Sequence, residues 1–294
     1  MSSEPNRQAS TPGQRSGEKI AFPKPRAIVF KILGVLVPYS FGEVRLIKYS
    51  VENCAQFLDS HLLDPSVLKL LPKIKKNYDS IATTNTSCPA VSFDGFFRIL
   101  NIEDEAERKK EIDSKRETIN EFKSKLTAFL VFAFQTASSE SPANEIQNLI
   151  WQEGYTTNKL KSEFYEEAPA KLKEWKSEAN IRLFTLSSGT VAAQQITLRN
   201  SLAGNLLSYM DGEICSSKLD KKSTSCYTRI AEIVNEERKS ILFVSGSLAE
   251  VKAASICGLK TCLLLRREKS ADIDESVYKE VIDVAHDLNQ IEFN

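Results

Sequence analysis

Polar side chains follow three short apolar runs of the sequence. Lys31 follows the first run, Ser187 and Ser188 follow the second, and Ser245 follows the third. Hydroxyl groups and backbone N–H groups at the start of a helix can hold a phosphate. Lys221, in a polar loop ahead of a predicted helix, is the lysine expected to balance the phosphate charge. Each feature alone is typical of an ordinary helix cap. A phosphate site is therefore predicted only if the fold brings these residues together.

The apolar runs themselves predict buried strands. They lie at residues 27–30, 181–186, 241–244 and 261–265, and the last three alternate with amphipathic helices. This order predicts a parallel sheet flanked by helices. Ligands bind such sheets at the carboxyl ends of the strands, so the polar residues that follow the strands are the ones expected to form a site.

A long helical block separates the first predicted strand from the others. Within residues 102–134, apolar residues recur every seven positions, while interleaved charges in the first half indicate a solvated helix face. Asp64 followed by Pro65 predicts the start of another helix. The sequence therefore predicts a flexible polar tail (1–20), an α/β core (21–44 and 146–294) and an inserted helical cap (45–145).

Composition excludes several classes of function. The 294 residues include 39 basic and 39 acidic side chains, so no net charge favours nucleic acid or an anionic membrane. The longest apolar stretch, residues 128–134, is too short to span a bilayer, and no signal peptide is recognisable. Six scattered cysteines predict free thiols, and only two histidines are present, which disfavours a zinc site. We expect a cytoplasmic protein.

Several motifs in order along the chain are distinctive together. They are residues 34–41 (GVLVPYSF), 149–155 (LIWQEGY), 172–176 (LKEWK), 186–194 (LSSGTVAAQ), 226–230 (CYTRI) and 241–245 (ILFVS). Through them the chain resembles the enolase-phosphatase branch of the haloacid dehalogenase (HAD) superfamily, from about residue 26 to residue 267. The resemblance implies a HAD-like Rossmannoid α/β core with an α-helical cap. It also implies the Mg²⁺-dependent reaction of methionine salvage on 2,3-diketo-5-methylthiopentyl-1-phosphate.

The chain departs from the family at the positions that carry the reaction. In the family, the first strand ends in Asp-Ile-Glu-Gly, and its aspartate attacks phosphorus and binds magnesium. Here Lys31 replaces that aspartate, and Leu33 replaces the glutamate. Gly246 stands where a third acid binds the metal. Magnesium requires oxygen ligands, and a protonated lysine repels it, so we expect no bound metal, no Mg²⁺ cofactor and no ordinary phosphatase activity.

The phosphate-contacting positions match the family better. Ser187 and Ser188 fit the pattern, and Lys221 is placed at the motif lysine, although Lys222 fits nearly as well. We therefore expect a pseudophosphatase with a binding or regulatory role, whose partners are a phosphorylated small molecule and an active relative. Lys31 is expected either to take the place of the metal as a positive charge, or to leave a vestigial pocket by pairing with an acid such as Glu250 or turning to solvent.

Three other interpretations remain open. The first is an active enolase-phosphatase that draws replacement acids from other loops, namely Asp211, Glu213, Asp220 or Glu250. The second is a scaffold in which the pocket has no role. The third, a cysteine phosphatase using Cys215 or Cys226, is disfavoured because Cys226 lies on a predicted amphipathic helix and is expected to pack in the core.

Overall fold

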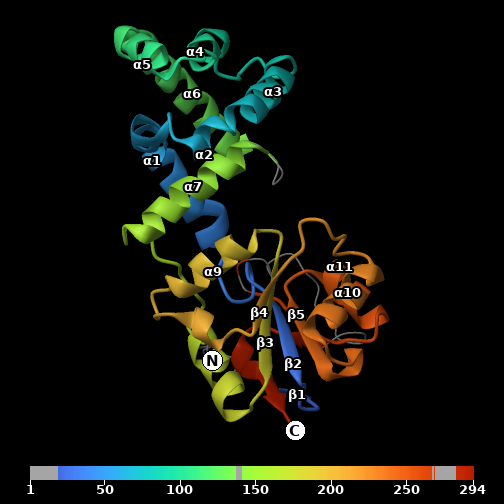
Figure 1. The fold of residues 1–294 in the computed structure, drawn as a ribbon. Helices are drawn as coiled ribbons and strands as arrows, with labels where there is room; N and C mark the ends of the chain where they lie inside the picture. Colours follow the sequence, from blue (N-terminus) through green and yellow to red (C-terminus); the bar gives the residue numbers. More distant parts are fainter. Residues whose placement is uncertain (1–18, 137–140, 267, 269–282) are drawn as a thin grey trace, which may run out of the picture. The chain divides into compact units, whose positions relative to one another are not determined.

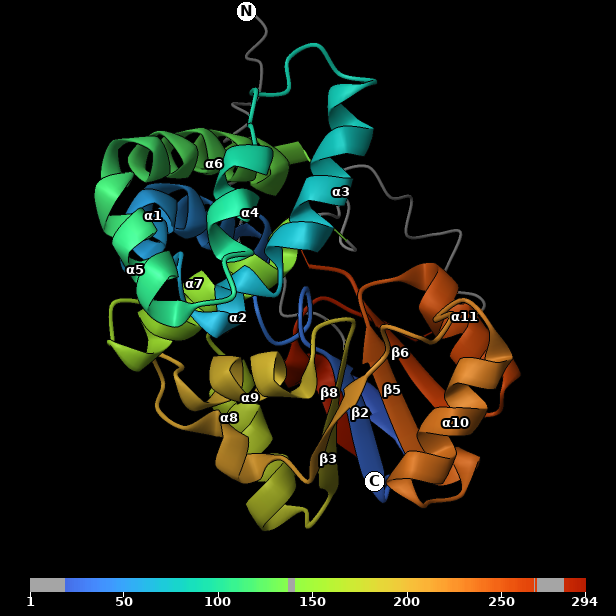
Figure 2. The same cartoon turned by 45° about the horizontal axis from the view of Figure 1, so that its top comes forward.

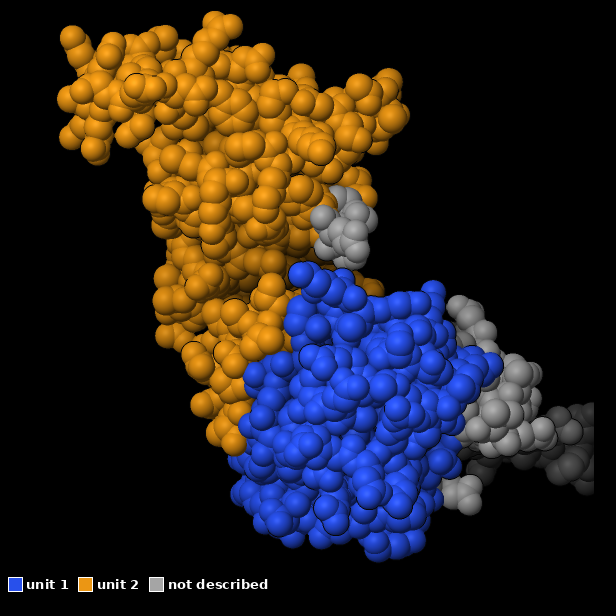
Figure 3. Space-filling view, turned by 45° about the vertical axis from the view of Figure 1, so that its right-hand side comes forward, with its two compact units in different colours: residues 1–36, 165–188, 209–294 blue, residues 37–164, 189–208 orange. Residues whose placement is uncertain are grey.

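The computed structural model describes residues 19–136, 141–266, 268 and 283–294 (Figure 1). Most of the predicted tail, residues 1–18, lies outside the described residues. Contacts divide the chain into two compact units, coloured separately in Figure 3. Unit 1 comprises residues 1–36, 165–188 and 209–294, and unit 2 comprises residues 37–164 and 189–208. The boundaries predicted at residues 44 and 146 stay a prediction.

A parallel sheet forms the centre of unit 1. Within the described residues it has six strands in the order β4-β3-β2-β5-β6-β7. Their bounds are β2 Ala27–Lys31, β3 Arg182–Ser187, β4 Gly212–Cys215, β5 Ile241–Ser245, β6 Lys260–Leu264 and β7 Asp283–Ala285. A separate parallel pair joins β1 (Ile20–Phe22) to β8 (Ile291–Phe293). The four apolar runs of the sequence correspond to β2, β3, β5 and β6.

The central strand β2 is buried on both faces. Its first four residues are fully buried, as expected for a parallel strand covered on both sides. Ala27 and Val29 pack with α10 (Thr224–Val234) and α11 (Leu248–Ile256), which lie side by side in Figure 2. Successive side chains of a strand point to opposite faces, so Phe30 points to the other face of the sheet. The sheet is therefore covered on both faces, on one of them by α10 and α11.

Trp175 covers the Phe30 face. It lies in the π-helical segment η2 (Glu174–Glu178), which follows α8 (Ala168–Lys173), and only 1% of its surface is exposed. Its ring stacks on Phe30 with the centroids 5.7 Å apart, and Phe293 contacts it at 5.8 Å. Through this ring, the C-terminal strand β8 is packed onto the central strand of the sheet.

Unit 2 is helical and has its own apolar core. Phe129 of α6 contacts the edge of Tyr78 in α3, and Phe122 of α6 stacks on Phe96 in α4. The bounds are η1 Ser40–Arg45, α1 Leu46–His61, α2 Pro65–Leu68, α3 Leu71–Ala82, α4 Asp94–Leu100, α5 Glu105–Ser114, α6 Arg116–Thr136, α7 Ala143–Thr156 and α9 Val191–Arg199. Short 3₁₀ turns are η3 Leu206–Tyr209, η4 Arg238–Ser240 and η5 Leu288–Gln290.

The predicted fold class is confirmed: an α/β protein with a parallel-sheet core and a helical insertion after the first core strand. The helix predicted across residues 102–134 is divided at Lys115 into α5 and α6. No residue of α5 is buried, in agreement with the solvated face that its charges predict. Among the described residues, no helix is both long and apolar enough to cross a membrane.

Removal of the Trp175 ring tests this packing. We expect Trp175→Ala to lower the free energy of unfolding by about 3–5 kcal/mol, because the surrounding structure cannot fill the cavity left by a buried indole. The matched control is Ile256→Ala, since Ile256 is 78% exposed; its change should stay within about 0.5 kcal/mol. Urea unfolding followed by circular dichroism measures both, and an equal effect of the two substitutions would contradict a structural role for the indole.

Candidate functional site at the carboxyl edge of the sheet

Three strands bring polar residues to one edge of the sheet. Lys31 is the last residue of the central strand β2, Ser187 is the last residue of β3, and Ser245 is the last residue of β5. Strand β2 lies between the other two, with Lys31 in register with Leu186. Residues that the sequence separates by up to 214 positions therefore end at the same edge.

Glu250 is the centre of the contacts at this edge. It lies in the first turn of α11 and is 7% exposed. The Lys31 Nζ atom is 3.4 Å from its Oε1 atom, and the Lys221 Nζ atom is 3.7 Å from the same oxygen. The Ser245 hydroxyl donates a 2.8 Å hydrogen bond to the other oxygen, Oε2. One buried carboxylate is thus shared by two lysines and a serine.

The turn between β5 and α11 positions this carboxylate. The backbone N–H of Ser247 donates to the Ser245 hydroxyl oxygen at 3.1 Å, so the serine is fixed from both sides. Gly246 occupies the intervening position and supplies no side chain to the site. The turn therefore presents Glu250, rather than a residue at position 246, to Lys31.

The charges at this edge do not cancel. Burial, the largest effect, lowers the pKa of Lys31, and the neighbouring Lys221 lowers it further, whereas the attraction of Glu250 opposes both. With both lysines protonated, the three side chains carry a net charge of about +1. Such a group favours the approach of an anion and opposes the approach of a metal cation.

Lys221 is positioned by a buried tyrosine. The Tyr227 hydroxyl donates to the Lys221 carbonyl oxygen at 2.8 Å, and the ring contacts the edge of Phe243 at 5.0 Å between centroids. Lys222, by contrast, is exposed, and its backbone N–H donates to Asp220. The structure therefore brings Lys221, and not Lys222, to Glu250.

The two serines after β3 differ in exposure. Ser187 is half-buried, and its carbonyl oxygen accepts a 2.8 Å hydrogen bond from the Ser216 N–H, whereas Ser188 is exposed. Thr190 caps α9, because its hydroxyl oxygen accepts from the Ala193 N–H at 3.1 Å. Ser187 reaches the same edge of the sheet as Lys31. Its role and that of Ser188 in phosphate binding stay a prediction.

The segment after Lys31 turns sharply away from the sheet. Gly34 has φ of 81°, a left-handed conformation that side-chain-bearing residues rarely adopt. The Leu36 N–H donates to the Ile32 carbonyl oxygen at 3.0 Å and closes the turn. Leu33, at the position where the resemblance implies a glutamate, is half-buried within it and offers no metal ligand.

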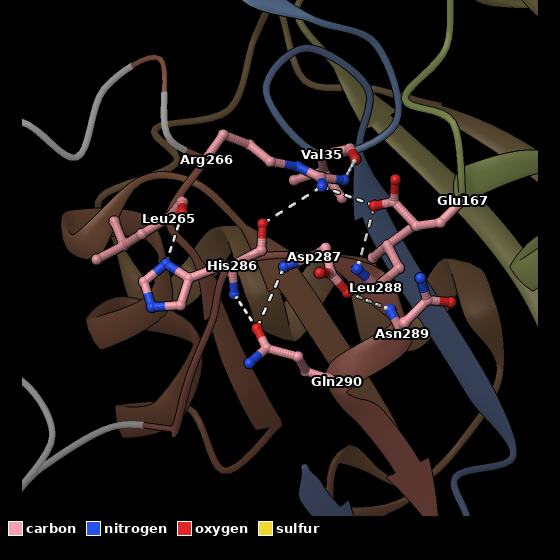
Figure 4. Close-up of polar contacts among 9 residues, drawn as sticks. All are labelled: Val35, Glu167, Leu265, Arg266, His286, Asp287, Leu288, Asn289 and Gln290. Atoms are coloured by element: carbon pink, nitrogen blue, oxygen red, sulfur yellow. Dashed lines mark hydrogen bonds and ion pairs between the residues drawn. The ribbon is translucent and has the colours of Figure 1, made fainter. Parts of the chain in front are cut away.

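Arg266 secures this turn to the rest of unit 1 (Figure 4). Its Nη2 donates to the Val35 carbonyl oxygen at 2.6 Å, and its Nη1 donates to Glu167 Oε1 at 2.6 Å. The guanidinium also lies over the Tyr165 ring, 3.7 Å from the centroid. Glu167 in turn accepts from the backbone N–H of Leu288 at 3.2 Å. The network joins the turn after β2 to the end of β6 and to the C-terminal segment.

Sequence reasoning did not identify this network. The available signal was a charged residue, Arg266, directly after the apolar run of β6, at the carboxyl edge where the other site residues lie. Its acidic partner is 99 positions away in sequence. Only the fold brings the two together.

Of the four proposed replacement acids, only Glu250 reaches Lys31. Asp211 precedes β4 at the opposite, amino-terminal edge, where it accepts from the Leu183 N–H and pairs with Lys176 at 2.7 Å. Glu213 lies within β4, in register with Thr185. Asp220 accepts from the N–H of Lys222 within its own loop. Replacement acids therefore do not converge on the end of β2.

These residues do not fit a magnesium ion. The three positions at which the resemblance implies acids offer an ammonium, an isobutyl group and a hydrogen atom, and Glu250 is already paired. In the part of the chain that the structure describes, no three His, Cys, Asp or Glu side chains lie together as a metal site.

The cysteines are free thiols, as expected. Burial raises the pKa of Cys226 to about 11, so this thiol stays protonated at neutral pH. Cys226 packs in the core beneath the sheet, and the Cys215 sulfur lies 3.2 Å from the Ser217 hydroxyl. A protonated buried thiol is a poor nucleophile for phosphorus.

Comparisons with known proteins give full-length relatives. The chain is 28% identical over 256 residues to the Enolase-phosphatase E1 of Persephonella marina, covering 87% of this chain and 95% of that protein. It is 29% identical to the Enolase-phosphatase E1 of a Sulfurihydrogenibium species, covering 94% of it. Over 150 residues, 51% of the chain, it is 32% identical to the protein of the same name from Drosophila melanogaster, of which it covers 58%. No protein-family model matches the chain.

A solved structure shares the fold. The UTR4 protein of Saccharomyces cerevisiae superposes with a TM-score of 0.63, covering 90% of this chain and 98% of that one, at 19% sequence identity. This similarity concerns the fold alone. The relatives that span most of the chain carry the name of the family that the sequence motifs resemble.

The Arg266 network gives a prediction for stability. We expect Arg266→Met to cost about 3–5 kcal/mol, because it leaves the Glu167 carboxylate without its cation in a site where both side chains are largely buried. Adding Glu167→Gln should recover part of the loss. The control is Arg229→Met, which breaks an exposed pair with Glu232 and should cost less than about 1 kcal/mol. Equal losses in chemical denaturation would contradict a stabilising role for the buried pair.

Proposed function

We propose that this homologue of the enolase-phosphatases is a pseudophosphatase that binds a phosphorylated small molecule without cleaving it. The observation that argues most strongly against cleavage is the place of Lys31, whose ammonium group lies 3.4 Å from Glu250 at the end of the central strand, the pairing expected for a vestigial pocket. The family resemblance puts the attacking aspartate at that position. A lysine paired with a buried acid takes its place. Binding is supported instead by Lys221, a second lysine at the same carboxylate.

The chemistry argues against phosphate cleavage. Attack on phosphorus needs an oxygen nucleophile at the end of β2, and an ammonium group has no lone pair to donate. The charge of the ammonium also opposes a divalent ion beside it. Loss of a covalent nucleophile alone can reduce turnover by about a million-fold. The surviving polar contacts would then support binding rather than turnover.

The same charges argue for anion binding. Lys31 and Lys221 share a single carboxylate, so one positive charge is left to attract a phosphate. Ser187 ends the neighbouring strand and adds a hydroxyl group at this edge. In this proposal the Lys31 ammonium supplies the positive charge that magnesium supplies in the active family members.

A second candidate is an active phosphatase, because the full-length relatives carry the name enolase-phosphatase. In that case the substrate would be 2,3-diketo-5-methylthiopentyl-1-phosphate, and Glu250 is the one replacement acid that lies beside Lys31. For Glu250 to act, it would have to leave two lysines and the Ser245 hydroxyl. The proposal of a pseudophosphatase requires no such rearrangement.

Release of phosphate from a panel of phosphomonoesters with Mg²⁺ separates the two candidates. We expect none from the wild type above background, and measurable release after the combined substitutions Lys31→Asp, Leu33→Glu and Gly246→Asp, which return the three family acids. The matched control combines Lys222→Asp with Leu33→Glu and Gly246→Asp. It makes the same change of charge but keeps Lys31, and it should release no phosphate above background. Mg²⁺-dependent turnover by the wild type would contradict the proposal.

Binding of inorganic phosphate or a non-hydrolysable phosphonate tests the role of Lys31. Calorimetry should show binding by the wild type and a loss of about 10- to 100-fold in affinity for Lys31→Ala, the loss expected when one charge-assisted hydrogen bond is removed. Lys222→Ala, a change at an exposed lysine next to the site, should leave the affinity unchanged. If Lys31→Ala binds as well as the wild type, the lysine does not replace the metal and the pocket is vestigial.

A further inference from the structure

The Lys31 side chain differs from the ordinary surface lysines of this chain. It extends from a fully buried strand, and 16% of its side-chain surface remains exposed. The amine is therefore largely enclosed at the carboxyl edge of the sheet, with a small part of the side chain exposed. A nucleophile at the end of a central strand has the same setting as the residues that carry chemistry in other parallel-sheet proteins.

Two lysines compete for one carboxylate at this position. An ammonium group has three donors and no acceptor, so two of them side by side cannot bond to each other while both are protonated. The two nitrogens lie 3.4 and 3.7 Å from the same Glu250 oxygen. Burial lowers the pKa of Lys31, the attraction of Glu250 opposes this, and the charge of Lys221 lowers the pKa further. In the resting site both lysines are ammonium groups, as the proposed function requires, and loss of one proton from Lys31 to give a reactive amine relieves this conflict. The more enclosed amine, Lys31, is the one that burial favours in the neutral form.

A neutral lysine amine is a nucleophile for carbonyl carbon. Lysines become reactive in this way when they are desolvated or lie next to another cation, and both conditions hold for Lys31. By comparison, a lysine with the unperturbed pKa of about 10.4 is neutral in only roughly one molecule in 2,500 at pH 7. Lys31 is therefore expected to react faster than an exposed lysine such as Lys222.

The neighbours of Lys31 can move the protons that such a reaction requires. The Glu250 Oε1 atom is 3.4 Å from the Lys31 nitrogen and can accept a proton from it. The Ser245 hydroxyl holds the other oxygen in place. Among the described residues, other charged or titratable groups coupled to this cluster are Lys221, Asp220, the protonated Cys226 thiol and the Tyr227 phenol.

We propose that Lys31 forms a reversible imine with a carbonyl-bearing phosphomonoester whose phosphate is held at the same edge of the sheet. The inference rests on the proposed function, because it uses the same anion site. It goes further in that the ligand is captured covalently through its aldehyde or ketone group, while its phosphate ester stays intact.

The reaction balances without an oxidant or a reductant. The lone pair of the Lys31 nitrogen forms a bond to the carbonyl carbon, and the C=O π electrons move to the oxygen. Glu250 takes a proton from the nitrogen and returns it to that oxygen, which gives a carbinolamine. The C–O bond then breaks as the nitrogen lone pair forms the C=N bond. The remaining N–H proton passes through Glu250 to the departing oxygen, which leaves as one water molecule. Addition of water reverses the sequence and releases the ligand.

Pyridoxal 5′-phosphate, an aldehyde that carries a phosphate monoester, is a suitable probe. Intact wild-type protein is mixed with a limiting amount at neutral pH, the imine is reduced with borohydride, and labelled lysines are located by peptide mass spectrometry. We expect the adduct to form on Lys31 at least about ten-fold faster than on Lys222, because the bound phosphate holds the aldehyde beside the amine.

Two comparisons make the result specific. Lys31→Arg keeps the positive charge but cannot form an imine, so it should remove the fast-labelling phase without loss of the folded circular dichroism spectrum. Pyridoxal, which lacks the phosphate, should label Lys31 more slowly than its phosphate ester does. Labelling spread over exposed lysines, or an unchanged fast phase in Lys31→Arg, would overturn the imine. If both aldehydes label Lys31 at the same rate, the phosphate group does not direct the ligand to Lys31, and a phosphomonoester is not its ligand.

The test separates failure of the imine from failure of the proposed function. One outcome is that Lys31→Ala weakens phosphate binding while wild-type Lys31 shows no fast labelling. That result rejects the imine but still supports the proposed function in phosphate binding. Mg²⁺-dependent phosphate release by the wild type instead rejects the pseudophosphatase, whatever the labelling pattern.

Discussion

The pairing of one buried carboxylate with two lysines sets the chemistry of this protein. Glu250 is nearly inaccessible, so its charge requires a partner, and Lys31, Lys221 and Ser245 together provide three. These contacts fill the end of the central strand with positive charge. The family resemblance implies an acid and a metal at this position. In the proposed function, the positive charge of the two lysines takes the place of that metal.

The rest of unit 1 serves to hold these few atoms in place. Strand β2 is fully buried up to the residue before Lys31, and Trp175 fixes the strand from one face. Tyr227 fixes the backbone of Lys221. Arg266 fixes the turn that follows Lys31 through the Val35 carbonyl oxygen. These contacts hold the backbone on three sides of the lysine pair.

Sequence patterns were sufficient to predict the main strands, because a buried parallel strand is a continuous apolar run in the sequence. They were insufficient for β1, β4, β7 and β8, each three or four residues long, since such short strands have no periodicity to detect. The ends of β2, β3 and β5 could be placed at one edge from topology alone. The choice between Lys221 and Lys222, and the pairing with Glu250, depended on side-chain contacts made by residues 29 to 219 positions apart. Spacing in the sequence does not encode such contacts.

Metal binding tests the central claim most directly, because it asks whether this edge of the sheet is a cation site or an anion site. Mn²⁺ substitutes for Mg²⁺ and can be counted by electron paramagnetic resonance as it binds. We predict no stoichiometric Mn²⁺ binding by the wild type, and no difference between the wild type and Glu250→Gln. Binding of one Mn²⁺ per chain that Glu250→Gln removes would show that Glu250 leaves its lysines to hold a metal, and would contradict an anion site at this edge.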